Sequence, residues 1–181
     1  MLLHNERYEE IKECVVATFK KYDIKTIPID CFDLAKKLNI IMTPFSKLTA
    51  EQLNKIKFCE GEVIMFGIND KIYMFYNDMD FYETRQRFSM FHEIGHIVLG
   101  HRCESELAKS EADFFARYAI APIPIVDKLN CNNIVDLCKI FNISIDCAVN
   151  VLRNYENWIR LRQGNLKSYE KDLLELFDSQ E

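Results

Sequence analysis

Residues 84–99 constrain the fold more than any other segment, because they read as a helix that is apolar on most of its surface. Such a helix is normally buried, yet this one also carries His92, Glu93 and His96. Buried polar side chains need partners. The rest of the fold must therefore bring ligands or hydrogen-bonding groups to this helix. Its apolar side chains are Phe88, Phe91, Ile94, Val98 and Leu99.

The spacing of the polar residues points to a metal site. His92 and His96 are four residues apart, which places both imidazoles on one face of a helix, where they can bind one metal ion. Glu93 is rotated by about 100° from His92, so we expect it beside the water on the metal. A carboxylate there suits a general base in peptide hydrolysis. The alternative is a pair of core histidines that hydrogen-bond to the backbone.

A catalytic zinc ion usually takes three protein ligands and one water, so a third ligand should lie downstream. Glu111 lies near the centre of the apolar face of the helix predicted for residues 105–120. An unpaired carboxylate in that position would be costly, and a zinc ion would compensate its charge. The alternative is an ion pair with Arg85, Arg87 or Arg102.

Two other downstream residues are weaker candidates for a metal ligand. His101 follows Gly100, which we expect to end the preceding helix, so the His101 side chain is expected to point elsewhere. Asp113 lies four residues from both Lys109 and Arg117, a spacing typical of a solvated ion-pair residue.

Composition excludes several classes of protein. The formal net charge of −5 and the lack of a long basic run disfavour direct nucleic-acid binding, because the overall charge repels a phosphate backbone. Charged residues near the N-terminus are not typical of a signal peptide, and no apolar run approaches the roughly 20 residues that span a bilayer. We therefore expect a cytoplasmic protein with no membrane partner. The seven cysteines form no Cys-x-x-Cys pair, so we expect free thiols that are buried or partly buried.

The apolar periodicity predicts an α+β fold that is mainly helical, with a small, mostly antiparallel sheet beside the motif helix. Residues 1–130 form the predicted main domain, and residues 131–181 a helical, helix-turn-helix-like extension packed on it as one structural unit. The predicted strands are residues 39–45, 63–66 and 72–76, the last two joined by a turn. The predicted helices are residues 5–22, 29–38 with Asp30 as N-cap, 84–99, 105–120, 134–141, 144–155 and 166–177, and we expect Pro122 and Pro124 to end the regular structure after residue 120.

Three stretches together resemble the ImmA/IrrE family of metallo-endopeptidases: residues 85–101 (RQRFSMFHEIGHIVLGH), residues 110–116 (SEADFFA) and the pair Ala121-Pro122. The resemblance covers about residues 30–155. It implies a zincin-like fold with one zinc ion (Zn2+) per chain, His92, His96 and Glu111 as the zinc ligands and Glu93 as the catalytic residue. It also implies a protein substrate, a helix-turn-helix repressor of a phage or mobile element. The sequence departs from the family pattern at residues 118–120, where two leucines and a methionine are expected.

Several interpretations stay open at this stage. The first is a zinc endopeptidase of narrow specificity, in which residues 63–66 or 72–76 supply a sheet edge to the substrate. The second is a metal-stabilised regulatory or antitoxin-like binding module without proteolytic activity. A DNA-binding role for residues 134–153 is disfavoured, because Lys139 and Arg153 supply little positive charge. Tyr118 and His101 are auxiliary candidates for stabilising the oxyanion.

Overall fold

The computed structural model describes residues 4–57, 63–69, 71–79, 83–103, 105–162 and 164–178. Over these residues the chain is mostly helical, as predicted, and contains a three-stranded sheet. The elements are α1 (Asn5–Tyr22), α2 (Cys31–Lys37), β1 (Ile41–Pro44), η1 (Phe45–Lys47), α3 (Ala50–Lys57), β2 (Val63–Ile68), β3 (Lys71–Tyr76), α4 (Glu83–Val98), α5 (Glu106–Ile120), α6 (Ile123–Lys128), α7 (Ile134–Phe141), α8 (Ile145–Arg162) and α9 (Ser168–Asp178).

The sheet has the order β1-β3-β2, and it corrects the prediction of a mostly antiparallel sheet. β2 and β3 are antiparallel, but β1 is parallel to β3. The reason is the long connection from β1 through η1 and α3, which carries the chain to the far side of β3 before β2 begins. Because β3 pairs on both sides, residues 72–76 cannot supply a sheet edge to a substrate.

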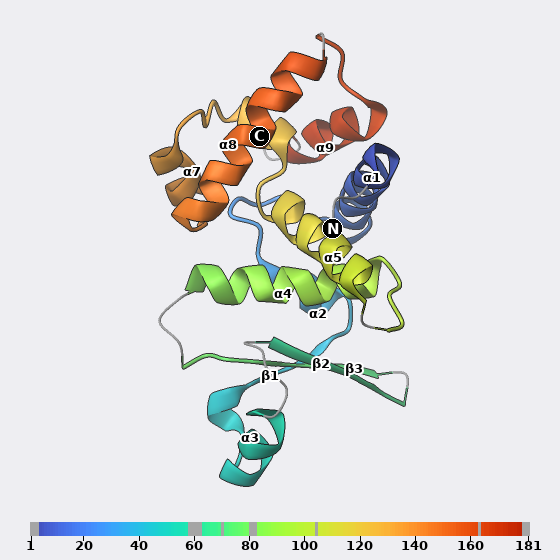
Figure 1. Cartoon of the computed structure of the whole chain (residues 1–181), viewed down its shortest axis with the longest axis vertical. Helices are drawn as coiled ribbons and strands as arrows, with labels where there is room; N and C mark the ends of the chain where they lie inside the picture. Colours follow the sequence, from blue (N-terminus) through green and yellow to red (C-terminus); the bar gives the residue numbers. More distant parts are fainter. Residues whose placement is uncertain are drawn as a thin grey trace.

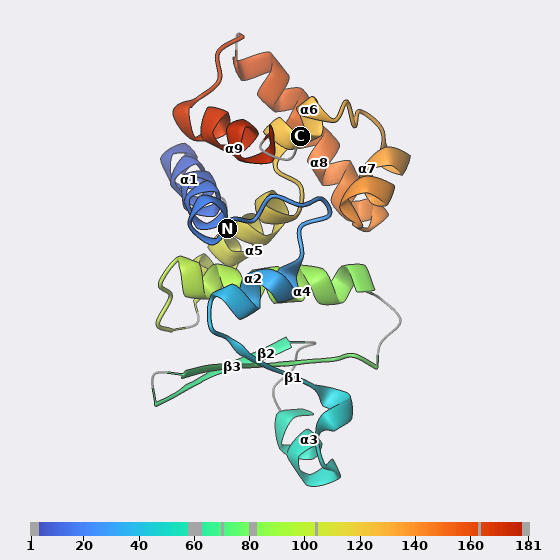
Figure 2. The same cartoon turned by 180° about the vertical axis from the view of Figure 1, so that it is seen from behind.

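Helix α4 lies between the sheet and the other large helices, while α3 lies on the opposite side of the sheet (Figures 1 and 2). Among the described helices, α4 makes its most extensive contact with α5, and Gly95 explains how closely these two helices pack. A Cβ atom at Gly95 would lie 3.0 Å from Cδ1 of the fully buried Phe115. The missing side chain therefore lets α4 and α5 pack closely enough for groups on both helices to share one site.

The helices of the C-terminal region pack on the rest of the chain. Helix α9 contacts α1 and α6, and α8 also contacts α6. Within this region the buried Glu170 accepts hydrogen bonds from Trp158 Nε1 at 2.6 Å and from the Lys167 backbone at 2.8 Å. Because α9 contacts α1, the N-terminal helix α1 lies beside the C-terminal helix α9, as Figure 2 shows.

All the predicted helices are present, although α8 continues to Arg162, past its predicted end at residue 155. The Asp30 N-cap is also confirmed, since its side chain accepts from the backbone of Phe32 and Asp33. Two short helices were not predicted, α3 and α6. Pro122 and Pro124 do not end the regular structure but begin α6, since proline is well suited to the first turn of a helix. None of the described helices combines the length and apolar character needed to cross a membrane.

The described cysteines are free thiols, as predicted, and all of them except Cys103 are buried or partly buried. Cys31 and Cys131 are buried, whereas Cys103 is exposed in the loop between α4 and α5. Burial raises the pKa of the Cys31 thiol to about 12, so this thiol stays protonated and unreactive at neutral pH. Cys59 lies outside the described residues.

Candidate metal centre

The motif histidines lie on one face of α4, as their spacing predicts. Nε2 of His92 and Nε2 of His96 face each other at 3.1 Å, and both side chains are half-buried. Two ligands on a tetrahedral zinc ion, each about 2.0–2.1 Å from the metal, would lie roughly 3.3 Å apart. The two nitrogens therefore have a separation that suits neighbouring positions on one metal ion.

The outer nitrogen of each motif histidine contacts another side chain. His92 Nδ1 lies 2.8 Å from Asp113 Oδ1, and His96 Nδ1 lies 2.9 Å from His101 Nδ1. His101 Nε2 in turn lies 2.9 Å from Glu111 Oε2. Three imidazoles thus form a continuous chain of contacts between two carboxylates, one at each end.

The three imidazoles carry fewer N–H protons than there are contacts in this row of side chains. Three neutral imidazoles carry three N–H protons, and the chain has four contacts. The two carboxylates accept hydrogen bonds from the N–H groups of His92 and His101, so only the N–H proton of His96 remains for the two contacts between imidazoles. If that proton lies on Nδ1 toward His101, two Nε2 lone pairs face each other. A metal ion between the two Nε2 atoms would bind both lone pairs. The N–H group on Nδ1 of each ring would donate to Asp113 or His101, as is usual for metal-ligating histidines.

Glu111 is buried, with 6% of its surface exposed, so the prediction that it faces the core is confirmed. Its charge is compensated by an arginine, as the alternative proposed, but by Arg7 of α1. Arg7 Nε donates to Oε1 at 2.8 Å and an Nη donates to Oε2 at 2.7 Å. These hydrogen bonds hold the pKa of Glu111 below its usual value. The burial of Glu111 therefore does not by itself require a metal, and its role as a ligand stays a prediction.

The three arginines considered from the sequence lie elsewhere. Arg85 and Arg102 are exposed. Arg87 is buried, and one of its Nη atoms donates to the backbone oxygen of Phe141 at 3.4 Å. Among the residues that the structure describes, no three His, Cys, Asp or Glu side chains converge in a geometry that could hold one metal ion. The two histidines are in place, whereas Glu111 is held by Arg7 and His101.

Asp113 was only partly understood from the sequence. Its ion pair with Arg117 is present at 3.6 Å, as the spacing predicted. Its shorter contact, at 2.8 Å, is with His92, and this hydrogen bond lowers the pKa of the Asp113 carboxyl. The contact joins α5 to α4, so no periodicity within one helix could have indicated it.

The remaining predicted site residues are Glu93, His101 and Tyr118. Glu93 is half-buried on α4, directly after His92. The prediction that His101 points elsewhere is wrong, because His101 contacts both His96 and Glu111 and therefore belongs to the site. Gly100, at φ 71°, ends the helix with a left-handed residue, and the His101 backbone N–H donates to the His96 oxygen at 3.0 Å, which keeps His101 beside the end of α4. The Tyr118 hydroxyl is buried and has no hydrogen-bond partner within the described part of the chain. Burial raises its pKa, and the charges that act on it are those of Glu170 and Glu9, on the α9 and α1 side.

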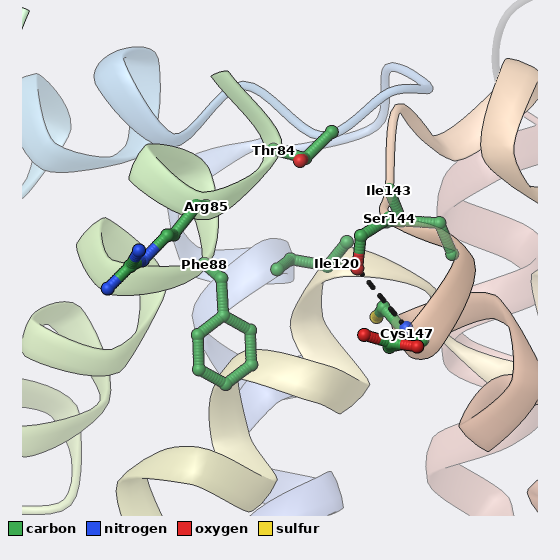
Figure 3. Close-up of a pocket in the computed structure, with 8 residues that line it drawn as sticks. Thr84, Arg85, Phe88, Ile120, Ile143, Ser144 and Cys147 are labelled. Carbon is green, nitrogen blue, oxygen red and sulfur yellow. Dashed lines mark hydrogen bonds between the residues drawn. The ribbon is translucent and has the colours of Figure 1, made fainter. Parts of the chain in front are cut away.

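A cavity of about 420 Å³ lies apart from this centre, between the start of α4, the end of α5 and the turn before α8 (Figure 3). Phe88, Ile120 and Ile143 form its apolar part. The three histidines of the candidate centre do not line it.

Comparison of the chain with models of protein families gives no match, and comparison with curated proteins gives none either.

Proposed function

We propose that this protein is a zinc-dependent endopeptidase of narrow specificity. The observation that carries the proposal is the pair of Nε2 atoms of His92 and His96, which face each other at 3.1 Å, with Glu93 next to His92 on the same helix. A purely structural zinc site is closed by four protein ligands and has no use for an adjacent general base.

The roles of the side chains follow from this arrangement. His92, His96 and Glu111 would hold zinc, which, when bound, supplies a Lewis acid for the substrate carbonyl and makes its water more acidic. Glu93 would accept the proton of the attacking water and donate it to the leaving amine. Asp113 and His101 would fix the orientation and tautomer of the two histidines through their outer nitrogens.

The nature of the substrate is proposed from the resemblance to the ImmA/IrrE family. It would be a helix-turn-helix repressor of a phage or mobile element, met in the cytoplasm. The zincin-like fold belongs to the same proposal. In the sheet, β2 pairs with β3 alone among the described strands and contacts α4, so it is the better candidate for pairing with an extended substrate.

The alternative is a metal-stabilised binding module without proteolytic activity, and Glu93→Gln separates the two. We would measure zinc per chain and cleavage of the repressor encoded beside the gene, for the parent protein, for Glu93→Gln and for Glu106→Gln. Glu106 is an exposed glutamate in the first turn of α5 and serves as the control.

We expect one zinc ion per chain in all three proteins and cleavage by the parent and Glu106→Gln alone. Loss of general-base catalysis should reduce the rate by at least about 100-fold in Glu93→Gln. Equal cleavage by the parent and Glu93→Gln would refute the role of Glu93. Absence of zinc from all three proteins would refute the metal centre, and stoichiometric zinc without cleavage would favour the binding module.

A further inference from the structure

Arg7 joins the N-terminal helix to the candidate metal centre. It lies in the first turn of α1, and its guanidinium contacts both carboxylate oxygens of Glu111, on α5. The contact pairs a planar cation with a carboxylate through two parallel hydrogen bonds, which is the strongest common arrangement of this kind. The guanidinium therefore holds Glu111 in a defined position.

The lone pairs of Glu111 are largely occupied in this position. Oε2 accepts from both Arg7 and His101, and Oε1 accepts from Arg7. A carboxylate offers about four lone-pair sites, so one site on Oε1 remains. Zinc binds a carboxylate oxygen at about 2.0–2.2 Å, and it would have to do so beside a guanidinium that cannot lose its charge. Arg7 and zinc are thus two cations that need the same buried carboxylate.

Arg7 also has a second carboxylate within reach. Its other Nη atom donates to Glu10 at 2.8 Å, and Glu10 is exposed, as is about a third of the Arg7 side chain. If Arg7 left Glu111, it would keep an ion pair on its own helix and move toward solvent. The exchange of arginine for zinc at Glu111 would then leave no buried charge uncompensated.

We propose that Arg7 competes with zinc for Glu111, so that the N-terminal helix sets the metal affinity of the centre. The proposal rests on the proposed function, because it takes Glu111 as the third zinc ligand. Arg7 is then a positioning residue: it neutralises Glu111 while the metal is absent and releases it when zinc binds. Removing Arg7 should tighten zinc binding, whereas removing an ordinary supporting residue of a metal site weakens it.

The test is the zinc dissociation constant of the metal-free, full-length protein, measured by competition with a chromophoric chelator at constant pH and ionic strength. The variants are Arg7→Gln, Glu111→Gln, the double variant and Lys12→Gln. Lys12 is the matched control, because it is a cation on α1 that pairs with Glu9 at 2.9 Å and does not contact Glu111.

We expect Arg7→Gln to tighten zinc binding by at least about tenfold, the scale of one charge-assisted hydrogen bond. Lys12→Gln should change the affinity by less than about threefold. In the Glu111→Gln background, substitution of Arg7 should have no effect, because the carboxylate for which the two cations compete is gone.

The outcomes separate this proposal from the proposed function. If neither the parent nor Arg7→Gln binds zinc, the proposed function fails. If the parent binds zinc and Arg7→Gln binds it equally or more weakly, the role of Arg7 is refuted and the peptidase is not. Tightening that persists in the Glu111→Gln background would also refute it, since the effect would then be general electrostatics.

A second variant covers the case in which Arg7→Gln does not fold without metal. Arg7→Lys keeps the charge but loses the two-point contact, so it should bind zinc severalfold more tightly than the parent and, where Arg7→Gln folds, less tightly than that variant. An affinity equal to or below that of the parent would overturn the proposal. Circular dichroism of each metal-free variant establishes that the affinities compare folded proteins.

Discussion

Asp113 and His92 are joined across two helices: Asp113 Oδ1, on α5, lies 2.8 Å from His92 Nδ1, on α4. Since a carboxylate accepts a hydrogen bond, this contact places a proton on Nδ1 of His92, which in the neutral ring leaves the lone pair on Nε2, the atom that faces His96. The orientation of this histidine is therefore set from outside the motif helix.

The first prediction concerns this contact. Asp113→Ala should weaken zinc binding by about 10–100-fold, because the ring of His92 loses the carboxylate that fixes its tautomer. The zinc dissociation constant measures the effect, and thermal unfolding shows whether the fold is kept. Arg117→Ala is the control, since Arg117 contacts the other Asp113 oxygen at a longer 3.6 Å. Equal losses in the two variants would mean that the effect arises from local charge and not from the contact with His92.

The second prediction concerns the packing of α4 on α5. A methyl group at Gly95 would lie 3.0–3.2 Å from three atoms of Phe115, which is fully buried and has little room to move. Gly95→Ala should therefore lower the free energy of unfolding by about 1–2 kcal/mol, although alanine favours a helix by about 1 kcal/mol. Urea denaturation measures the change. Gly67→Ala, where nothing lies within 4 Å of the added carbon, should change it by less than about 0.5 kcal/mol. A Gly95→Ala protein as stable as the parent would contradict the prediction.

The third prediction concerns the buried hydroxyl of Tyr118. Since this hydroxyl has no partner within the described residues, Tyr118→Phe should leave the free energy of unfolding unchanged or raise it by up to about 1 kcal/mol. Tyr169→Phe is the comparison, because Tyr169 donates to Glu9 at 2.6 Å and its loss should cost about 1–2 kcal/mol. A reduced turnover rate with an unchanged Michaelis constant in Tyr118→Phe would instead assign Tyr118 to the oxyanion.

The fourth prediction concerns acid stability. Burial raises the pKa of Glu9, but hydrogen bonds from Lys167, Tyr169 and Lys12 outweigh it and lower the pKa from 4.5 to about 2. A carboxyl whose pKa falls on folding stabilises the native state above the unfolded pKa, and this contribution is lost as the pH falls from about 4.5 toward 2.

Glu9→Gln should therefore be less stable than the parent at pH 5–7, by about 1–2 kcal/mol once solvent screening is allowed for. The difference should disappear near pH 2. Urea denaturation at several pH values between 2 and 7 tests this, with the exposed Glu13→Gln as the control. A difference independent of pH would contradict the assignment.

The sequence was sufficient for features that depend on local periodicity. The ranges of α1, α2, α4, α5, α7 and α9 follow from apolar spacing, and so do the shared face of His92 and His96 and the burial of Glu111. Each of these depends on residues a few positions apart, whose geometry a helix fixes.

Contacts between distant segments could not be predicted in the same way. Arg7 meets Glu111 across 104 positions of sequence, and nothing in the pattern of α1 distinguishes Arg7 from its other polar residues. The parallel pairing of β1 with β3 was missed for a related reason, since it depends on the path of the connection between the two strands and not on the strand sequences. The candidate third ligand was recognised, but the cation beside it was not.

The position of Arg7 on α1 has a consequence for how the centre could be altered. Ile11 lies one helical turn after Arg7 and is completely buried in the core. A single residue inserted between them would turn Arg7 by about 100° relative to the buried face of the helix. The hydrophobic face of α1 from Ile11 onward would stay in place, while the guanidinium would point away from Glu111. One inserted residue between Arg7 and Ile11 could thus change the metal affinity of the centre, although His92, Glu93 and His96 stay unaltered.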